Sequence, residues 1–161
     1  MSQEIEGSFN ISGQNIAIIG ARFNEAITLR LLKGAMEGLQ SSGMGKEAIQ
    51  IFWVPGSFEI PLIAKSLALS KKFNAIICLG AVIKKETAHF EYVSAQMAGG
   101  IASVSLETTT PVIFGVLTTY DYSQALERSG GSQGNRGYDA ALAAIQMSNL
   151  LKNIGQTYPE S

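Results

Sequence analysis

The sequence predicts an α/β protein, a three-layer α/β/α sandwich built on a four-stranded parallel sheet. Four short runs are rich in aliphatic and β-branched residues, helical patterns separate them, and the middle runs are almost continuously apolar. The strands are expected over residues 15–21, 49–54, 75–83 and 111–119. Apolar strands that alternate with helices are typical of a parallel sheet covered on both faces and joined by right-handed crossovers.

Helices are expected in each gap between these strands and after the last one. The first begins near Asn24, a favourable N-cap residue, and stops before Gly43. The others are expected over residues 58–71, 88–106, 123–129 and 138–154, with a polar glycine-rich loop over 130–137. Gly99 and Gly100 fall inside the third helix, where each costs about 1 kcal/mol relative to alanine, so this pair predicts close packing against another element.

The composition is typical of a globular protein with one domain. With 161 residues, 46% of them hydrophobic, it is expected to form a single domain over residues 1–161. Its 12 basic and 13 acidic side chains give a formal net charge of -1, which argues against a nucleic-acid partner. Because no apolar run is long enough to span a bilayer and residues 1–7 lack a basic leader pattern, we expect no membrane association and a cytoplasmic location.

The sequence offers few ligands for a metal and no familiar cofactor motif. Cys78 is the single cysteine and lies in an apolar run, which favours core packing and excludes an internal disulfide. One histidine, His89, and one distant cysteine do not make a zinc site. The dinucleotide, P-loop and hydrolase-elbow glycine patterns are also missing, so no metal and no cofactor is expected.

Reactive residue types gather where the predicted strands end, the edge at which open α/β sheets bind ligands. These segments are residues 21–24, 54–59, 84–89 and 118–121. His89 is a candidate for proton transfer, because imidazole exchanges protons near neutral pH. The alternative is an ordinary surface histidine at a helix terminus.

Other candidates in these segments also have two interpretations. Phe23 could stack on a flat heterocycle or pack its own loop. Glu59 could accept hydrogen bonds from hydroxyl groups or compensate a helix dipole. An anion could bind backbone N–H groups at Glu86 and Thr87, or the guanidinium of Arg128.

At these same segments the chain resembles the lumazine synthase family, and the resemblance runs nearly end to end. The family's motifs occur here in order as residues 21–24, 54–61, 79–84, 86–93, 114–119, 124–128 and 134–137. The resemblance implies a flavodoxin-like fold. It also implies condensation of 5-amino-6-(D-ribitylamino)uracil with 3,4-dihydroxy-2-butanone 4-phosphate to 6,7-dimethyl-8-ribityllumazine, without a cofactor.

The resemblance implies a role for each motif residue. His89 would donate and accept protons, while Glu86, Thr87 and Arg128 would hold the phosphate. The ribitylaminouracil would contact Phe23, Ser57, Phe58, Glu59, Ala81, Val82, Ile83 and, from an adjacent subunit, Phe114.

The resemblance also implies an assembly with the site between subunits of a homopentamer. Such pentamers pack into a 60-subunit icosahedral shell in part of the family, and riboflavin synthase is a possible associate. Residues 4–11 alternate weakly and are expected to add a strand to a neighbouring subunit's sheet. A short turn before the last helix also favours the shell.

The chain departs from the family pattern at charged positions. Many members have Arg-Gly where Lys84 and Lys85 stand, and Thr-Lys where Gly131 and Ser132 stand. Arg136 replaces a common lysine. Two alternatives to the enzyme remain open, a flavin- or lumazine-binding protein without catalysis and a structural shell protein.

Overall fold

The computed structural model describes residues 1–160 and contains the predicted parallel sheet. Its strands are β1 (Ile16–Ala21), β2 (Ile49–Val54), β3 (Ala75–Ile83) and β4 (Val112–Thr119), in the order β2-β1-β3-β4. The predicted strand bounds are confirmed to within a residue. The chain leaves β1 toward β2 and leaves β3 toward β4, so the connections diverge between β1 and β3, the place where such sheets bind ligands.

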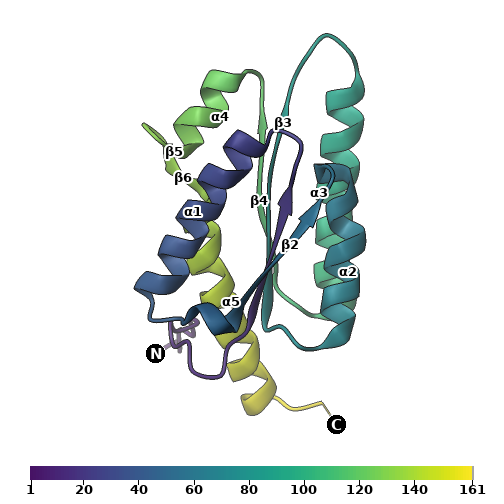
Figure 1. Cartoon of the computed structure of the whole chain (residues 1–161). Coiled ribbons are helices and arrows are strands. Elements are labelled where there is room, and N and C mark those ends of the chain that lie inside the picture. The colour runs from purple at the N-terminus through teal and green to yellow at the C-terminus, as the bar shows by residue number, and fades with distance from the viewer. Residues whose placement is uncertain (161) are drawn as a thin grey trace.

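Helices cover both faces of this sheet. As Figure 1 shows, α1 (Glu25–Ser41), α4 (Tyr122–Arg128) and α5 (Arg136–Thr157) lie on one side, and α2 (Ile60–Ser70) and α3 (His89–Thr108) on the other. Side chains of β1 alternate between the two apolar cores, because Ile16 and Ile18 pack toward α1 and α5 while Ala17 and Ile19 pack toward α2 and α3. This three-layer arrangement is flavodoxin-like, as predicted.

The glycine pair of α3 has a packing reason at one of its two positions. A Cβ atom on Gly100 would lie 2.7 Å from Cγ of Pro61, which stands in the first turn of α2, whereas one on Gly99 would meet nothing within 4 Å. Gly100 therefore allows α2 and α3 to approach closely, which identifies the packing partner that the sequence left open.

The prediction of a loop over residues 130–137 was wrong. Two short strands, β5 (Ser129–Gly131) and β6 (Gly134–Asn135), form an antiparallel hairpin there, and α5 starts at Arg136. The early start follows from capping, because Oδ1 of Asn135 accepts hydrogen bonds from the backbone N–H groups of Gly137, at 2.8 Å, and Tyr138, at 3.3 Å. Short 3₁₀ turns, η1 (Lys46–Ala48) and η2 (Ser57–Glu59), precede β2 and α2.

The N-terminal segment forms no strand within this chain and lies along α5 instead. Gln146 donates a hydrogen bond to the Glu6 carboxylate at 2.9 Å, and Asn149 donates to the carbonyl oxygens of Ser8 and Asn10 at 2.8 Å. Pairing of residues 4–11 with a neighbouring sheet stays a prediction. Within residues 1–160, no helix has the length and apolar character that crossing a membrane requires.

Candidate functional site

A cavity of about 610 Å³ opens at the carboxyl ends of β1, β2 and β3. It lies at the edge of the sheet that the strand order marks for ligand binding. Most predicted site residues line it, and they come from the ends of three strands and the start of α3: Phe23, Ser57, Phe58, Glu59, Ala81, Val82, Ile83, Thr87 and His89.

Phe23 presents its ring to this cavity from the turn after β1. The backbone N–H groups of Arg22 and Phe23 donate to the carbonyl oxygens of Val54 and Pro55 at 2.8 and 2.9 Å, which extends the contact between β1 and β2 past the end of the sheet. The Arg22 guanidinium lies 3.8 Å from the centroid of the Trp53 ring, and neither residue lines the cavity. Phe23 is 63% exposed, and a ring that exposed offers a face on which a heterocycle can stack.

Asn24 holds the first and third strands together at the cavity. It has a left-handed backbone conformation, φ 59°, which asparagine tolerates better than most residues. Its side chain makes no capping hydrogen bond to α1 and instead donates to the carbonyl oxygen of Ala81 at 2.8 Å. Asn24 therefore stands at the predicted N-cap position, while its side chain fixes the Phe23 turn against the end of β3.

The segment after β2 supplies one buried and two exposed side chains. Ser57 is buried, and a Cβ atom on Gly80 would lie only 2.8 Å from its Oγ, so the glycine in β3 leaves the space that Ser57 fills. Phe58 and Glu59 are exposed at the rim. This segment thus adds an aromatic ring, a carboxylate and a hydroxyl to the cavity, which suits a ligand carrying both a ring and hydroxyl groups.

His89 is the first residue of α3 and lines the cavity beside Thr87. Its backbone N–H lies 3.4 Å from Oγ1 of Thr87. Its side chain is exposed to solvent. Glu86 is exposed on the turn that leads into α3 and does not line this cavity, so the structure brings Thr87 and His89 together with Phe23 and leaves the Glu86 side chain outside.

Phe114 and Arg128 lie elsewhere, in a second cavity of about 490 Å³ along β4. The two cavities share no lining residue. Gln124 and Arg136 also line the second cavity, so two arginine residues contribute to it. Apart from Glu86, one chain therefore carries the predicted residues as two separate groups.

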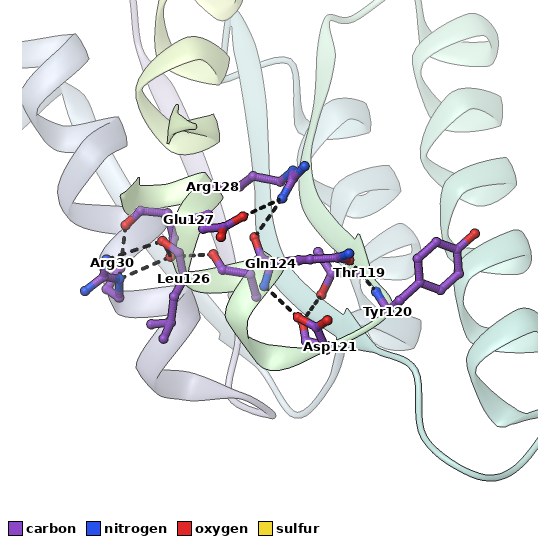
Figure 2. Close-up of polar contacts among 10 residues, drawn as sticks. Arg30, Thr119, Tyr120, Asp121, Gln124, Leu126, Glu127 and Arg128 are labelled. Atoms are coloured by element: carbon purple, nitrogen blue, oxygen red, sulfur yellow. Dashed lines mark hydrogen bonds and ion pairs between the residues drawn. The ribbon is translucent and has the colours of Figure 1, made fainter. Parts of the chain in front are cut away.

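Arg128 is the last residue of α4, a helix whose start is fixed by side-chain hydrogen bonds (Figure 2). Asp121 caps the helix by accepting from the backbone N–H of Gln124 at 2.8 Å, and the Gln124 side chain accepts from the backbone N–H of Tyr120 at 2.9 Å. Nη1 of Arg128 donates to the carbonyl oxygen of Gln124 at 3.2 Å and lies 3.5 Å from the Glu127 carboxylate. Its side chain is 34% exposed, so the guanidinium keeps donors free for an anion.

Sequence reasoning missed several residues that line the two cavities. In the first, these are Asn24, Pro55, Gly56, Lys85, Phe90, Tyr92, Val93 and Gln96. A signal was present, because Tyr92, Val93 and Gln96 follow His89 at helical spacing and so share its face of α3. In the second, Arg136 was singled out only as a departure from the family pattern.

Across residues 1–160, no group of three or more His, Cys, Asp and Glu side chains is placed to hold a metal ion. Cys78 is buried in β3, and this burial raises the pKa of its thiol well above the usual range, because the charged thiolate loses its hydration. The neutral thiol packs in the core, as predicted, and takes no part in either cavity.

Comparison with known proteins identifies the family. Residues 13–152 match the family model described as 6,7-dimethyl-8-ribityllumazine synthase. Two curated proteins of that name, from two strains of Clostridium kluyveri, are each 51% identical to the chain over 149 residues, covering 92% of this chain and 97% of theirs. The chain therefore belongs to the 6,7-dimethyl-8-ribityllumazine synthase family.

Proposed function

We propose that this protein condenses 5-amino-6-(D-ribitylamino)uracil with 3,4-dihydroxy-2-butanone 4-phosphate to 6,7-dimethyl-8-ribityllumazine, releasing phosphate and water, in riboflavin biosynthesis. The observation that carries the proposal is one cavity in which an exposed aromatic face, Phe23, lies with His89 and Thr87. Membership of the family supports the same reaction.

In this proposal the first cavity binds the ribitylaminouracil. The pyrimidine stacks on Phe23, while Ser57, Phe58 and Glu59 hold the ribityl chain and the ring. The end of β3, Ala81, Val82 and Ile83, contributes backbone groups to the pocket. The hydrogen bond from Asn24 to Ala81 supports this arrangement, because it ties the stacking face to the end of β3.

The ketone phosphate binds beside it, where backbone N–H groups of Glu86 and Thr87 meet a guanidinium. We assign that guanidinium to Arg128 of an adjacent subunit, and the ring that closes the heterocycle site to Phe114 of the same neighbour. The support is that Arg128 and Phe114 share no cavity with Phe23 in their own chain, yet line a cavity of their own at the edge strand β4.

The chemistry needs orientation and proton transfer. The exocyclic amine of the uracil attacks the ketone, and loss of water gives an imine. Elimination then expels inorganic phosphate, the resulting enol tautomerises, and the ribityl-bearing nitrogen closes the ring with loss of a second water. His89 donates and accepts protons in these steps, since it lies at the cavity beside the proposed stacking face.

The inter-subunit site requires an oligomer, and we propose a homopentamer that packs into an icosahedral shell. A further cavity of about 470 Å³ supports contact at this edge, because all of its lining residues from α3 and β4 except Ser105 are apolar, among them Ile101, Leu106 and Phe114. Leu106 is 83% exposed in the single chain. A single domain over residues 1–161, a cytoplasmic location and an association with riboflavin synthase stay predictions.

Mixing the purified protein with both substrates tests the proposed function. The expected result is formation of the lumazine, followed by its absorbance and fluorescence, with no product when either substrate is omitted. Binding of the lumazine without turnover would contradict the proposal and favour a carrier protein. Neither binding nor turnover would instead favour a structural shell protein.

A further inference from the structure

Two adjacent lysines after β3 have different surroundings. Nζ of Lys84 lies 3.5 Å from Oε1 of Glu91 and 5.7 Å from the ring centroid of Tyr120, outside the first cavity. Lys85 lines that cavity, and its Nζ lies 5.9 Å from the ring centroid of Phe23. Among the described residues that line the cavity, Lys85 is the one lysine or arginine side chain.

The ammonium group of Lys85 lies over the Phe23 ring, and both residues line the same cavity, so this group competes with the heterocycle of the first substrate for the ring. A cation over an exposed aromatic ring is held weakly, by roughly 0.5–1 kcal/mol, which corresponds to about two- to five-fold in an equilibrium constant. A stacked heterocycle buries far more of the ring. Binding of the heterocycle therefore displaces Lys85 from Phe23.

In the proposed function, the displaced ammonium group lies next to the phosphate site. Lys85 directly precedes Glu86 and Thr87, the residues whose backbone N–H groups hold the phosphate in the proposed function, and Thr87 lines the same cavity. The lysine stem is flexible and its head is a compact point charge, so it can turn from a ring face to a phosphate without a change in the backbone.

We propose that Lys85 is a positioning residue that couples the two halves of the site: its ammonium group covers Phe23 when the site is empty, leaves when the heterocycle stacks there, and then pairs with the phosphate. This inference rests on the proposed function. The heterocycle and the phosphate both favour the position of Lys85 away from Phe23. Each ligand therefore strengthens the binding of the other, and by the same factor.

The experiment measures the affinity of the whole oligomer for 6,7-dimethyl-8-ribityllumazine, with and without inorganic phosphate, at constant ionic strength kept by sodium chloride. Wild type is compared with Lys85→Met, which keeps the length of the stem and removes the charge. Lys84→Met is the matched control, because Lys84 is the adjacent lysine and does not line the cavity. Thermal unfolding of each variant verifies that the fold is intact.

In the wild type and in Lys84→Met, phosphate should tighten lumazine binding about two- to five-fold, the range set by the weak ring contact. In Lys85→Met this coupling should vanish. In steady state, Lys85→Met should raise KM for the ketone phosphate with kcat nearly unchanged, a split that a purely structural role would not give.

The inference is overturned if phosphate tightens lumazine binding equally in wild type and in Lys85→Met. It is also overturned if this effect of phosphate is lost equally in Lys84→Met and Lys85→Met. In those cases wild-type turnover still supports the proposed function. A wild-type protein that neither binds the lumazine nor forms it overturns both.

Discussion

Two residues decide what the first cavity presents to a ligand. Phe23 supplies an exposed ring, and Asn24 fixes the turn that carries this ring by its hydrogen bond to Ala81. The ring contributes little to the core, since most of its surface is in solvent. Its removal should therefore affect ligand binding far more than folding.

Phe23→Ala should weaken binding of the ribitylaminouracil by about 1–3 kcal/mol, the usual worth of a base stacked on an aromatic side chain. KM for the ketone phosphate should change much less, because the ring touches no phosphate in the proposed complex. Steady-state kinetics with each substrate varied in turn gives both values. Equal losses for the two substrates, accompanied by a lower melting temperature, would support the alternative that Phe23 packs its loop.

At the scale of elements, apolar patterning was sufficient to predict the four strands of the sheet. Strand interiors such as Ile16–Ala21 are buried on both faces, so their apolar runs are continuous and their bounds sharp. The hairpin at β5 and β6 was not predictable in this way, because it is short, polar and glycine-rich, and hydrogen bonds of Ser129 and Asn135 with the distant Arg30 of α1 hold it. The early start of α5 depends on the orientation of the Asn135 side chain, which a pattern does not record.

The candidate site likewise contains features that the sequence predicted and features that it did not. Motif residues at strand ends, such as Phe23 and His89, were predictable because strand ends share one edge of the sheet. The separation of Arg128 from them was not predictable from this chain's residues alone, because it depends on how β4 and α4 are placed. The family resemblance had implied a contribution from an adjacent subunit only for Phe114.

The glycine pair of α3 gives a matched test of helix packing. Gly100→Ala places a methyl group against Pro61 and should destabilise the fold by about 1–3 kcal/mol, the usual cost of overpacking. Gly99→Ala meets no neighbouring atom and should stabilise by up to about 1 kcal/mol through helix propensity. Chemical denaturation of both variants provides the comparison. A gain of stability at both positions would show that α2 and α3 do not approach as closely as described.

In the proposed function a single chain does not hold the complete site, since the two cavities with the candidate residues are separate. Heterologous contacts between identical chains generate a closed ring, and further symmetric contacts close a shell. Sedimentation or electron microscopy at micromolar concentration should therefore show a hollow particle of many 17.1 kDa subunits. A lone pentamer as the sole species would rule out the shell and leave the inter-subunit site intact. A monomer with full activity would exclude both.

Complementation between two damaged chains tests the central claim, a catalytic site assembled from two subunits. One parent carries Phe23→Ala and His89→Ala, which damage the first cavity, and the other carries Arg128→Ala, which damages the second. Each parent alone should form little lumazine. Co-expressed chains with two different affinity tags yield mixed oligomers, in which some interfaces join an intact first cavity to an intact second one. Their specific activity should exceed that of either parent. A mixed oligomer no more active than the average of its parents would contradict the claim of a shared site. That result would place Phe23, His89 and Arg128 at a site within one chain.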